Sequence, residues 1–193
     1  MTKIIAPLPE IAVSLIGSCK LACGDSQGLN FFNTTHQGFW RSFTAALLVA
    51  PIFALLLNVR YIANQNDVNV MRFICIYSVA YVIGWVAFPI LANYLAIALN
   101  RQKNFIRYII AYNWASVPQN IVYLPFATVV EAQLIQGDIT AVIGVILLGL
   151  VFLYTWFVTK SALEISALAA AGIVILDLML SIVISSITQG RLI

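Results

Sequence analysis

The chain has 193 residues, of which 62% are hydrophobic and 9% charged, and its mean hydropathy is +0.98. Soluble domains carry about 45–50% apolar and about 25% charged residues, so this composition excludes an ordinary soluble fold and predicts a one-domain integral membrane protein. The net charge is only +3 and the basic residues are scattered, which argues against a nucleic-acid partner.

Residues 1–38 are predicted to form a cytoplasmic N-terminal segment that contains a helix lying in the membrane interface. The stretch PLPEIAVSLIGSCKLACG is too short and too interrupted to span a bilayer. Its apolar residues share one helical stripe, while Glu10, Ser14 and Gly17 lie across from them. A lipoprotein signal ending at Cys19 is the alternative, but Pro7 and Glu10 interrupt the apolar core that such a signal needs.

Residues 39–193 are predicted to form an all-α bundle of five transmembrane helices. A bilayer core about 30 Å thick needs about 20 mostly apolar residues in a helix. Five segments meet that length, and short polar connections separate them: Phe39–Val59, Phe73–Leu99, Phe105–Leu134, Ile139–Thr159 and Leu163–Ile187.

Lysine and arginine predict the orientation, because these residues are retained on the cytoplasmic side. Three basic residues fall on the side away from the N terminus: Arg60, Arg72 and Arg191. Seven fall on the N-terminal side: Lys3, Lys20, Arg41, Arg101, Lys103, Arg107 and Lys160. This asymmetry predicts a cytoplasmic N terminus and an outside C terminus. The short length, the cysteine usage and the lack of sorting signals favour a bacterial inner membrane.

The third predicted span carries a polar face in its middle. Tyr112, Ser116, Gln119 and Tyr123 are spaced i, i+4, i+7 and i+11, so they share one helical stripe. Asn113 and Asn120 lie one position further on and widen it. Amide side chains are costly against lipid, so this face is expected to point into the bundle, and Pro118 and Pro125 favour a bent or interrupted helix.

Asp177 is the only ionisable residue near the middle of any predicted span. At about 1.5 Å per residue, it lies at the same depth as Gln119, about 21 Å from the cytoplasmic side. These positions predict a midplane binding cluster of Asp177, Gln119, Asn120 and Asn113, with Tyr112, Tyr81 and Trp85 beside it. The alternative is structural, since polar side chains in membrane bundles often only hydrogen-bond helices together, at about 0.6 kcal/mol each.

A second candidate feature is a stripe of small residues at Ala162, Ser166 and Ala170. Such stripes let helices approach closely, either within one chain or between copies. The stripe therefore predicts helix packing with membrane partners or in a homo-oligomer.

Enzyme chemistry and cofactors are not predicted. His36 is the only histidine, and the three cysteines have no neighbouring ligands with zinc-site spacing, so neither a metal nor a cofactor is expected. The sequence contains no Gly-x-Ser-x-Gly motif and no phosphate-binding glycine-rich loop.

The segments NRQKNFIRYIIAYNWASVP and YTWFVTKSALEIS make residues Phe39–Ile187 resemble the Yip family (Ypt/Rab-interacting-protein-like) of five-span membrane proteins. The resemblance implies a cytoplasmic N terminus and a C terminus across the membrane. Eukaryotic members are associated with Rab-type GTPases and vesicle traffic, while bacterial members, which this chain resembles more, are largely of unknown function. This chain lacks the long cytoplasmic N-terminal region that would support a GTPase partner.

The sequence supports two hypotheses about function. The first is a non-enzymatic scaffold or accessory subunit that works with membrane lipids and other membrane proteins. The alternative is a small-solute or ion transporter with a midplane site around Asp177.

Overall fold

The computed structural model describes residues 5–63 and 69–191, and this part of the chain is all-helical. It contains seven α-helices and two short 3-10 helices. In chain order these are α1 Leu8–Ala22, η1 Ser26–Phe31, α2 His36–Ser42, α3 Thr44–Ala63, α4 Val70–Ala98, η2 Gln102–Asn104, α5 Phe105–Glu131, α6 Asp138–Leu163 and α7 Ala167–Gly190.

Four helical segments of the described chain are long and apolar enough to cross a membrane: His36–Ala63, which joins α2 and α3, Val70–Ala98, Asp138–Leu163 and Ala167–Gly190. The chain is therefore a helical membrane protein. The fifth long helix, α5, is not among the four, because polar residues occupy its middle. The α-helix nevertheless continues past Pro118 and Pro125, although neither can donate a backbone hydrogen bond, so the helix that was predicted to be bent or interrupted is not interrupted.

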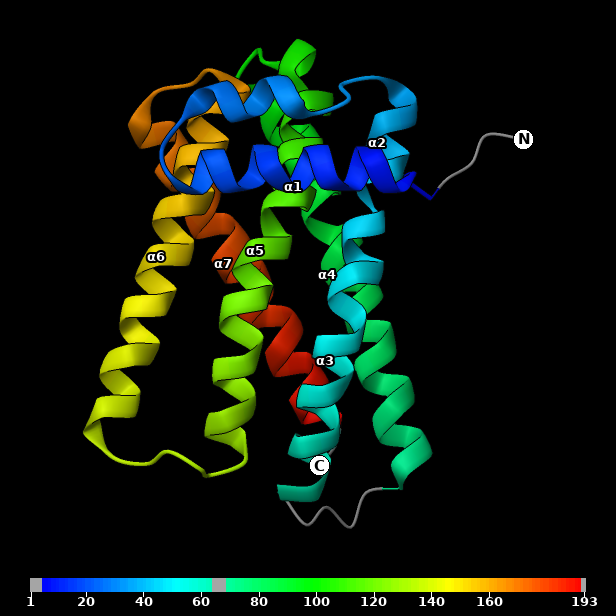
Figure 1. The fold of residues 1–193 in the computed structure, drawn as a ribbon, viewed down its shortest axis with the longest axis vertical. Coiled ribbons are helices and arrows are strands. Elements are labelled where there is room, and N and C mark those ends of the chain that lie inside the picture. Colours follow the sequence, from blue (N-terminus) through cyan, green and yellow to red (C-terminus); the bar gives the residue numbers. More distant parts are fainter. Residues whose placement is uncertain (1–4, 64–68, 192–193) are drawn as a thin grey trace.

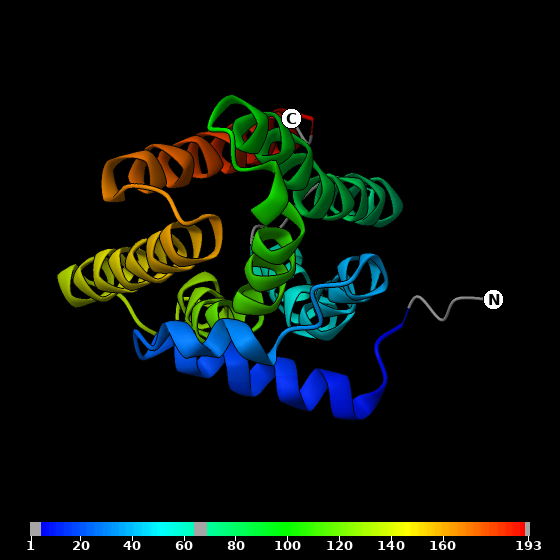
Figure 2. The same cartoon turned by 90° about the horizontal axis from the view of Figure 1, so that it is seen from above.

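The long helices run along the long axis of the molecule, and α1 lies across one end of them (Figure 1). This end, called the capped end, also contains α2, the connection between α4 and α5, and the turn between α6 and α7. The opposite end, called the distal end, contains the C-terminal ends of α3, α5 and α7. Seen from above, α1 and η1 lie along one side of the bundle, not over its centre (Figure 2).

α5 is the central helix and packs against α1, α2, α3, α4 and α6. In its first half, Tyr108, Ile109, Ala111 and Asn113 are fully buried. This position explains its composition, because a helix surrounded by other helices does not need an apolar surface and can hydrogen-bond to its neighbours instead.

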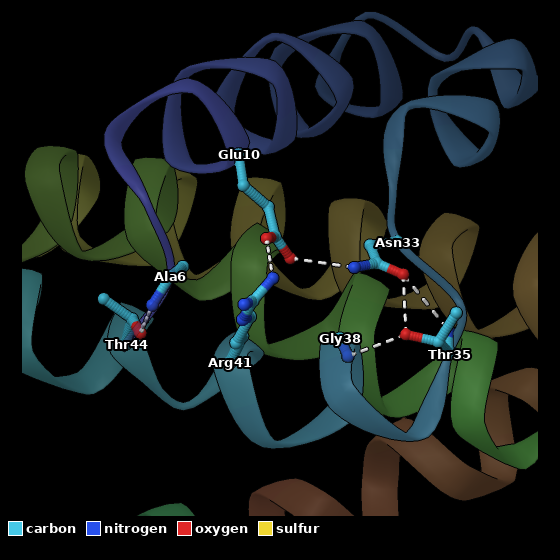
Figure 3. Close-up of polar contacts among 7 residues, drawn as sticks. All are labelled: Ala6, Glu10, Asn33, Thr35, Gly38, Arg41 and Thr44. Atoms are coloured by element: carbon cyan, nitrogen blue, oxygen red, sulfur yellow. Dashed lines mark hydrogen bonds and ion pairs between the residues drawn. The ribbon is translucent and has the colours of Figure 1, made fainter. Parts of the chain in front are cut away.

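Polar contacts between distant segments fasten α1 to the capped end (Figure 3). The Glu10 carboxylate on α1 accepts from the Arg41 guanidinium at 2.8 Å and from Asn33 Nδ2 at 3.2 Å. The Ala6 backbone N–H donates to Thr44 Oγ1 at 3.0 Å. Because these bonds reach α2 and α3, the N-terminal segment is part of the folded bundle.

The inward face of α1 combines small polar residues with apolar ones such as Leu21, whereas its outward face is apolar. Ser14, Gly17 and Ser18 are buried, whereas Leu8 is 81% exposed and Ile16 is 52% exposed. Gly17 is required by close packing, since a Cβ there would lie 2.8 Å from both the Gly28 carbonyl oxygen and the Phe31 Cβ. The outward face of α1 therefore differs from the solvent-facing side of a helix on a soluble protein, which is polar.

The turn between α6 and α7 is held by the start of α5. Glu164 adopts a left-handed conformation at φ 56° and ends α6. Arg107 donates to the Ala162 carbonyl oxygen and to the Glu164 carboxylate, the latter at 2.7 Å. Because of this hydrogen bond, the pKa of the Glu164 carboxyl lies below its usual value. Arg107 therefore has a structural partner, although its charge also belongs to the predicted topology signal.

Candidate functional site: an intramembrane cavity

A cavity of about 470 Å³ lies between α3, α4, α5 and α7. It falls within the size range of small-molecule sites, about 300–1,000 Å³. Its boundary is incomplete, since the lining residues Ser181 and Ser185 are exposed and Tyr123 is 42% exposed. The cavity is therefore an open cleft in the membrane-spanning part of the molecule.

Asp177 on α7 is the acidic residue of this cavity. It lies ten residues after Ala167, the first residue of α7, which corresponds to about 15 Å along the helix. Tyr112 Oη on α5 donates to Asp177 Oδ2 at 2.9 Å, so the two helices are linked across the cavity. In the part of the chain that the structure describes, no ion pair involves Asp177.

The polar lining comes from one face of each of two helices. On α5 it consists of Tyr112, Ser116, Asn120 and Tyr123, and on α7 of Asp177, Ser181, Ser185 and Thr188. Both sets repeat at three- and four-residue intervals, which places them on single helical stripes. The two stripes form a polar path that runs from Asp177 towards the distal end.

Aromatic residues form much of the remaining wall. The Phe53 and Tyr81 rings are stacked with centroids 4.8 Å apart, and Trp85 lies edge-on to Tyr81 at 6.2 Å. The Phe88 and Tyr112 rings lie 4.5 Å apart, which brings an aromatic pair next to the Asp177 hydrogen bond. Tyr81 Oη also donates to the Ala46 carbonyl oxygen at 2.7 Å, and this bond fixes α4 against α3.

Arg60 is the cationic residue of the lining and lies near the distal end. Its guanidinium contacts the Glu131 carboxylate at 3.1 Å, in an ion pair between α3 and α5. The positive charge of Arg60 is therefore matched by Glu131, while the Asp177 carboxylate faces the cavity.

The structure brings five of the seven predicted cluster residues to this cavity: Asp177, Asn120, Tyr112, Tyr81 and Trp85. The other two have different contacts. Gln119 Nε2 donates to Thr155 Oγ1 on α6 at 2.9 Å, and Asn113 Nδ2 donates to Ser42 Oγ on α2 at 2.9 Å. The predicted polar stripe of α5 included Gln119, but the amide that faces the cavity beside Tyr112 and Ser116 is that of Asn120.

The predicted small-residue stripe is not a face of one helix. Ala162 belongs to α6 and Ala170 to α7, and Ser166 caps α7 by accepting from the Ala169 N–H at 3.3 Å. The prediction was wrong because the predicted fifth span begins at Leu163, whereas a turn at Glu164 separates α6 from α7. Ala162 and Ala170 are both fully buried, so they serve packing within this chain.

Sequence reasoning named Tyr81 and Trp85 on α4 but missed other wall residues of the same helix, above all Tyr77, Gly84 and Phe88. Tyr77, Tyr81, Gly84, Trp85 and Phe88 follow one another at i, i+4, i+7, i+8 and i+11. This spacing of aromatic residues on one face was a readable signal. Arg60 was interpreted only as a topology charge, because its pairing with Glu131 joins segments far apart in the sequence.

The fold and the cavity define a class, that of helical membrane proteins with an open polar cleft between spanning helices. No group of three or more His, Cys, Asp or Glu that could hold a metal ion occurs within residues 5–63 and 69–191. Comparisons with protein-family models, with curated proteins and with solved structures give no match.

Proposed function

We propose that the protein is a non-enzymatic membrane protein that admits a small solute to the cavity between α3, α4, α5 and α7, as a transporter does. The observation that carries this proposal is the open 470 Å³ cleft with the Asp177 carboxylate on its wall. An ionisable side chain in a membrane span is costly and is commonly found on substrate or ion pathways. A side chain that served only to join helices would be expected in a closed contact.

Two further observations favour solute binding over structural joining. Asp177 has a single hydrogen-bonding side-chain partner, Tyr112, in the described structure. The amides that do join helices, Gln119 and Asn113, are directed away from the cavity towards α6 and α2. Helix joining and cavity lining are thus assigned to different polar residues of α5.

We also propose that α5 is a fifth membrane span, with the capped end in the cytoplasm and the distal end outside. α5 has 27 residues and connects the two ends of the bundle (Figure 1). The basic residues of the capped end outnumber those of the distal end, which favours this orientation in a bacterial inner membrane. Lys3, which belongs to that count, lies outside the described residues. Membership of the Yip family, which implies the same topology, is part of this proposal.

The apolar outer face of α1 supports an interfacial position for this helix. Leu8, Val13 and Ile16 are exposed on a helix that lies across the end of the bundle. A helix lying in the interface buries such a face about 5–10 Å into the boundary between headgroups and acyl chains. Membrane lipid is therefore the proposed partner of α1.

Cysteine accessibility tests the proposed cavity directly. Cys19, Cys23 and Cys75 are replaced by serine, and single cysteines are then introduced by Ser185→Cys or Ser186→Cys. Both serines are exposed neighbours on α7, but only Ser185 lines the cavity. In lipid nanodiscs, we expect a water-soluble thiol reagent to modify Ser185→Cys about tenfold faster, because thiolates form only where water reaches. Equal, slow modification of both would contradict the proposal.

A scaffold or accessory-subunit role is the second candidate. It is favoured by the exposed face of α1, because a partner helix would cover Leu8, Val13 and Ile16 as well as lipid does. A pull-down in mild detergent tests it. A stoichiometric companion that is lost when Leu8, Val13 and Ile16 are replaced by serine would support the scaffold role, and recovery of a lone protein would contradict it.

A further inference from the structure

We propose that the occupant of the cavity is an organic ammonium group, bound by the Asp177 carboxylate and the surrounding aromatic rings. This inference rests on the proposed solute-binding function and adds its ligand class. The ammonium group belongs either to a free amine or to the headgroup of a lipid, since the cleft is open and lies among spanning helices.

The charge of the cavity favours a cation. Among the described residues, two charged ones line the cavity, Asp177 and Arg60, and the Arg60 charge is matched by Glu131 at 3.1 Å. This leaves the Asp177 carboxylate as the charge that faces the ligand. A charge in a low-dielectric site is stabilised by an opposite charge, and the described chain supplies none to Asp177.

The aromatic wall favours an ammonium group over a bare metal ion. Seven aromatic side chains line the cavity, among them Tyr81, Trp85, Phe88 and Tyr112. The faces of such rings attract cations, and alkylammonium groups suit such a site because their charge is weakly hydrated and they also bury apolar surface against the rings. A hard metal ion needs six or more oxygen ligands that converge on one point, whereas the polar lining residues here are spread along the stripes of α5 and α7.

The position of Asp177 fits a ligand contact. Its hydrogen bond from Tyr112 engages Oδ2 and orients the carboxylate, and Tyr112 is itself packed on Phe88 at 4.5 Å. The carboxylate is thereby held at the junction of an aromatic pair and the polar path along α7. An ammonium group at this junction can contact the carboxylate and the rings together.

Protection of a cavity cysteine from modification tests the inference. Ser181, one turn after Asp177 and on the same lining face, is replaced in the cysteine-free chain by Ser181→Cys. Its modification by the uncharged reagent N-ethylmaleimide is timed in nanodiscs made only of phosphatidylglycerol. The additions are choline or its uncharged isostere, 3,3-dimethylbutan-1-ol, which differ in charge and little in shape. The melting temperature of the unmodified chain, which has neither the cysteine replacements nor Ser181→Cys, is measured with the same additions.

We expect choline at millimolar concentration to slow the modification at least about threefold and the uncharged isostere to have no effect. In Asp177→Asn, choline is expected to give no more protection than its isostere, each compared with the modification rate of the same variant without additions. Slower basal modification in nanodiscs that contain phosphatidylethanolamine would also support the inference, and it would identify a lipid amine as the occupant.

Two results overturn the inference, and they differ in what they say about the proposed function. If the cysteine is modified readily but choline gives neither protection nor a melting-temperature shift beyond that of its isostere, the ligand class is wrong and the accessible cavity stands. If Ser181→Cys is not modified under any condition, the solute-accessible cavity is wrong as well.

Discussion

The two halves of α5 differ in their surroundings, although they belong to one helix. Before Pro118, Tyr108 and Asn113 are fully buried, and Tyr108 Oη and Asn113 Nδ2 are hydrogen-bonded to Thr159 and Ser42. After Pro118, Ile121, Val122 and Tyr123 are exposed, and Asn120 and Tyr123 line the open cavity. The first half is thus a packed core that reaches the cavity only through Tyr112 and Ser116, whereas the second half is largely exposed and borders the open part of the cavity.

This difference shows what polar residues do at each place. At the capped end they close contacts between segments, as Glu10 does with Arg41. Around the cavity, Asp177 keeps an accessible carboxylate with one hydrogen-bond partner from the side chains. A rigid capped end and an accessible cavity suit a protein in which one part fixes the helices and the other receives a ligand.

The largest effect is expected from Gly38→Ala at the capped end. A Cβ at Gly38 would collide with the Asn33 backbone carbonyl, which cannot move away as a flexible side chain can. We expect a loss of about 3 kcal/mol in the free energy of unfolding in detergent. Gly172→Ala is the control, because a Cβ there meets no atom within 4 Å. If both variants were equally stable, the packed character of the capped end would be wrong.

The next effect is expected from Arg41→Ala, which leaves the partly buried Glu10 carboxylate without its cation. We expect a loss of about 2 kcal/mol, because an unpaired group in such a position retains its desolvation cost. Lys103→Ala is the control, since Lys103 is exposed. A double-mutant cycle with Glu10→Gln measures the coupling free energy between the two side chains. A coupling near zero would show that this ion pair does not stabilise the packing of α1 on the bundle.

A larger side chain in the cavity should have a small effect on stability. Gly84 lines the cavity, and a Cβ there meets nothing within 4 Å, so Gly84→Leu is expected to change unfolding by less than about 0.5 kcal/mol. The same variant should slow thiol modification at position 185 by filling the cleft. Ala45→Leu is the contrast, because Ala45 is fully buried and overpacking there costs about 1–3 kcal/mol. Similar losses in both variants would show that the cavity is closed.

The smallest effect concerns Glu164 at the α6–α7 turn. Its pKa is lowered by the Arg107 hydrogen bond, so its stabilisation is present above the usual carboxyl range and fades as the pH falls through the lowered pKa. Melting temperatures of the unmodified chain and of Glu164→Gln are therefore expected to converge as the pH is reduced. A difference that persists or grows at low pH would contradict this assignment.

Helix type and approximate position were predictable from the sequence, because apolar runs of membrane length leave little choice of structure. The turn at Glu164 was missed because an αL conformation at a non-glycine residue has no strong local signal. The separation of Asn120 from Gln119 was missed for another reason. Adjacent residues on a helix face directions about 100° apart, and only the packing of α6 against α5 decides which amide faces the cavity.

In this account, Asp177 binds a ligand and contributes little to stability, whereas Asn113 stabilises the fold. Unfolding measurements in detergent on Asp177→Asn and Asn113→Ala compare the two residues directly. We expect Asn113→Ala to lose about 2 kcal/mol, because it removes a buried hydrogen bond to Ser42. Asp177→Asn is expected to be as stable as the unmodified chain or more stable, as is common for residues at binding sites. A loss at Asp177 as large as that at Asn113 would contradict the claim and make Asp177 a structural residue.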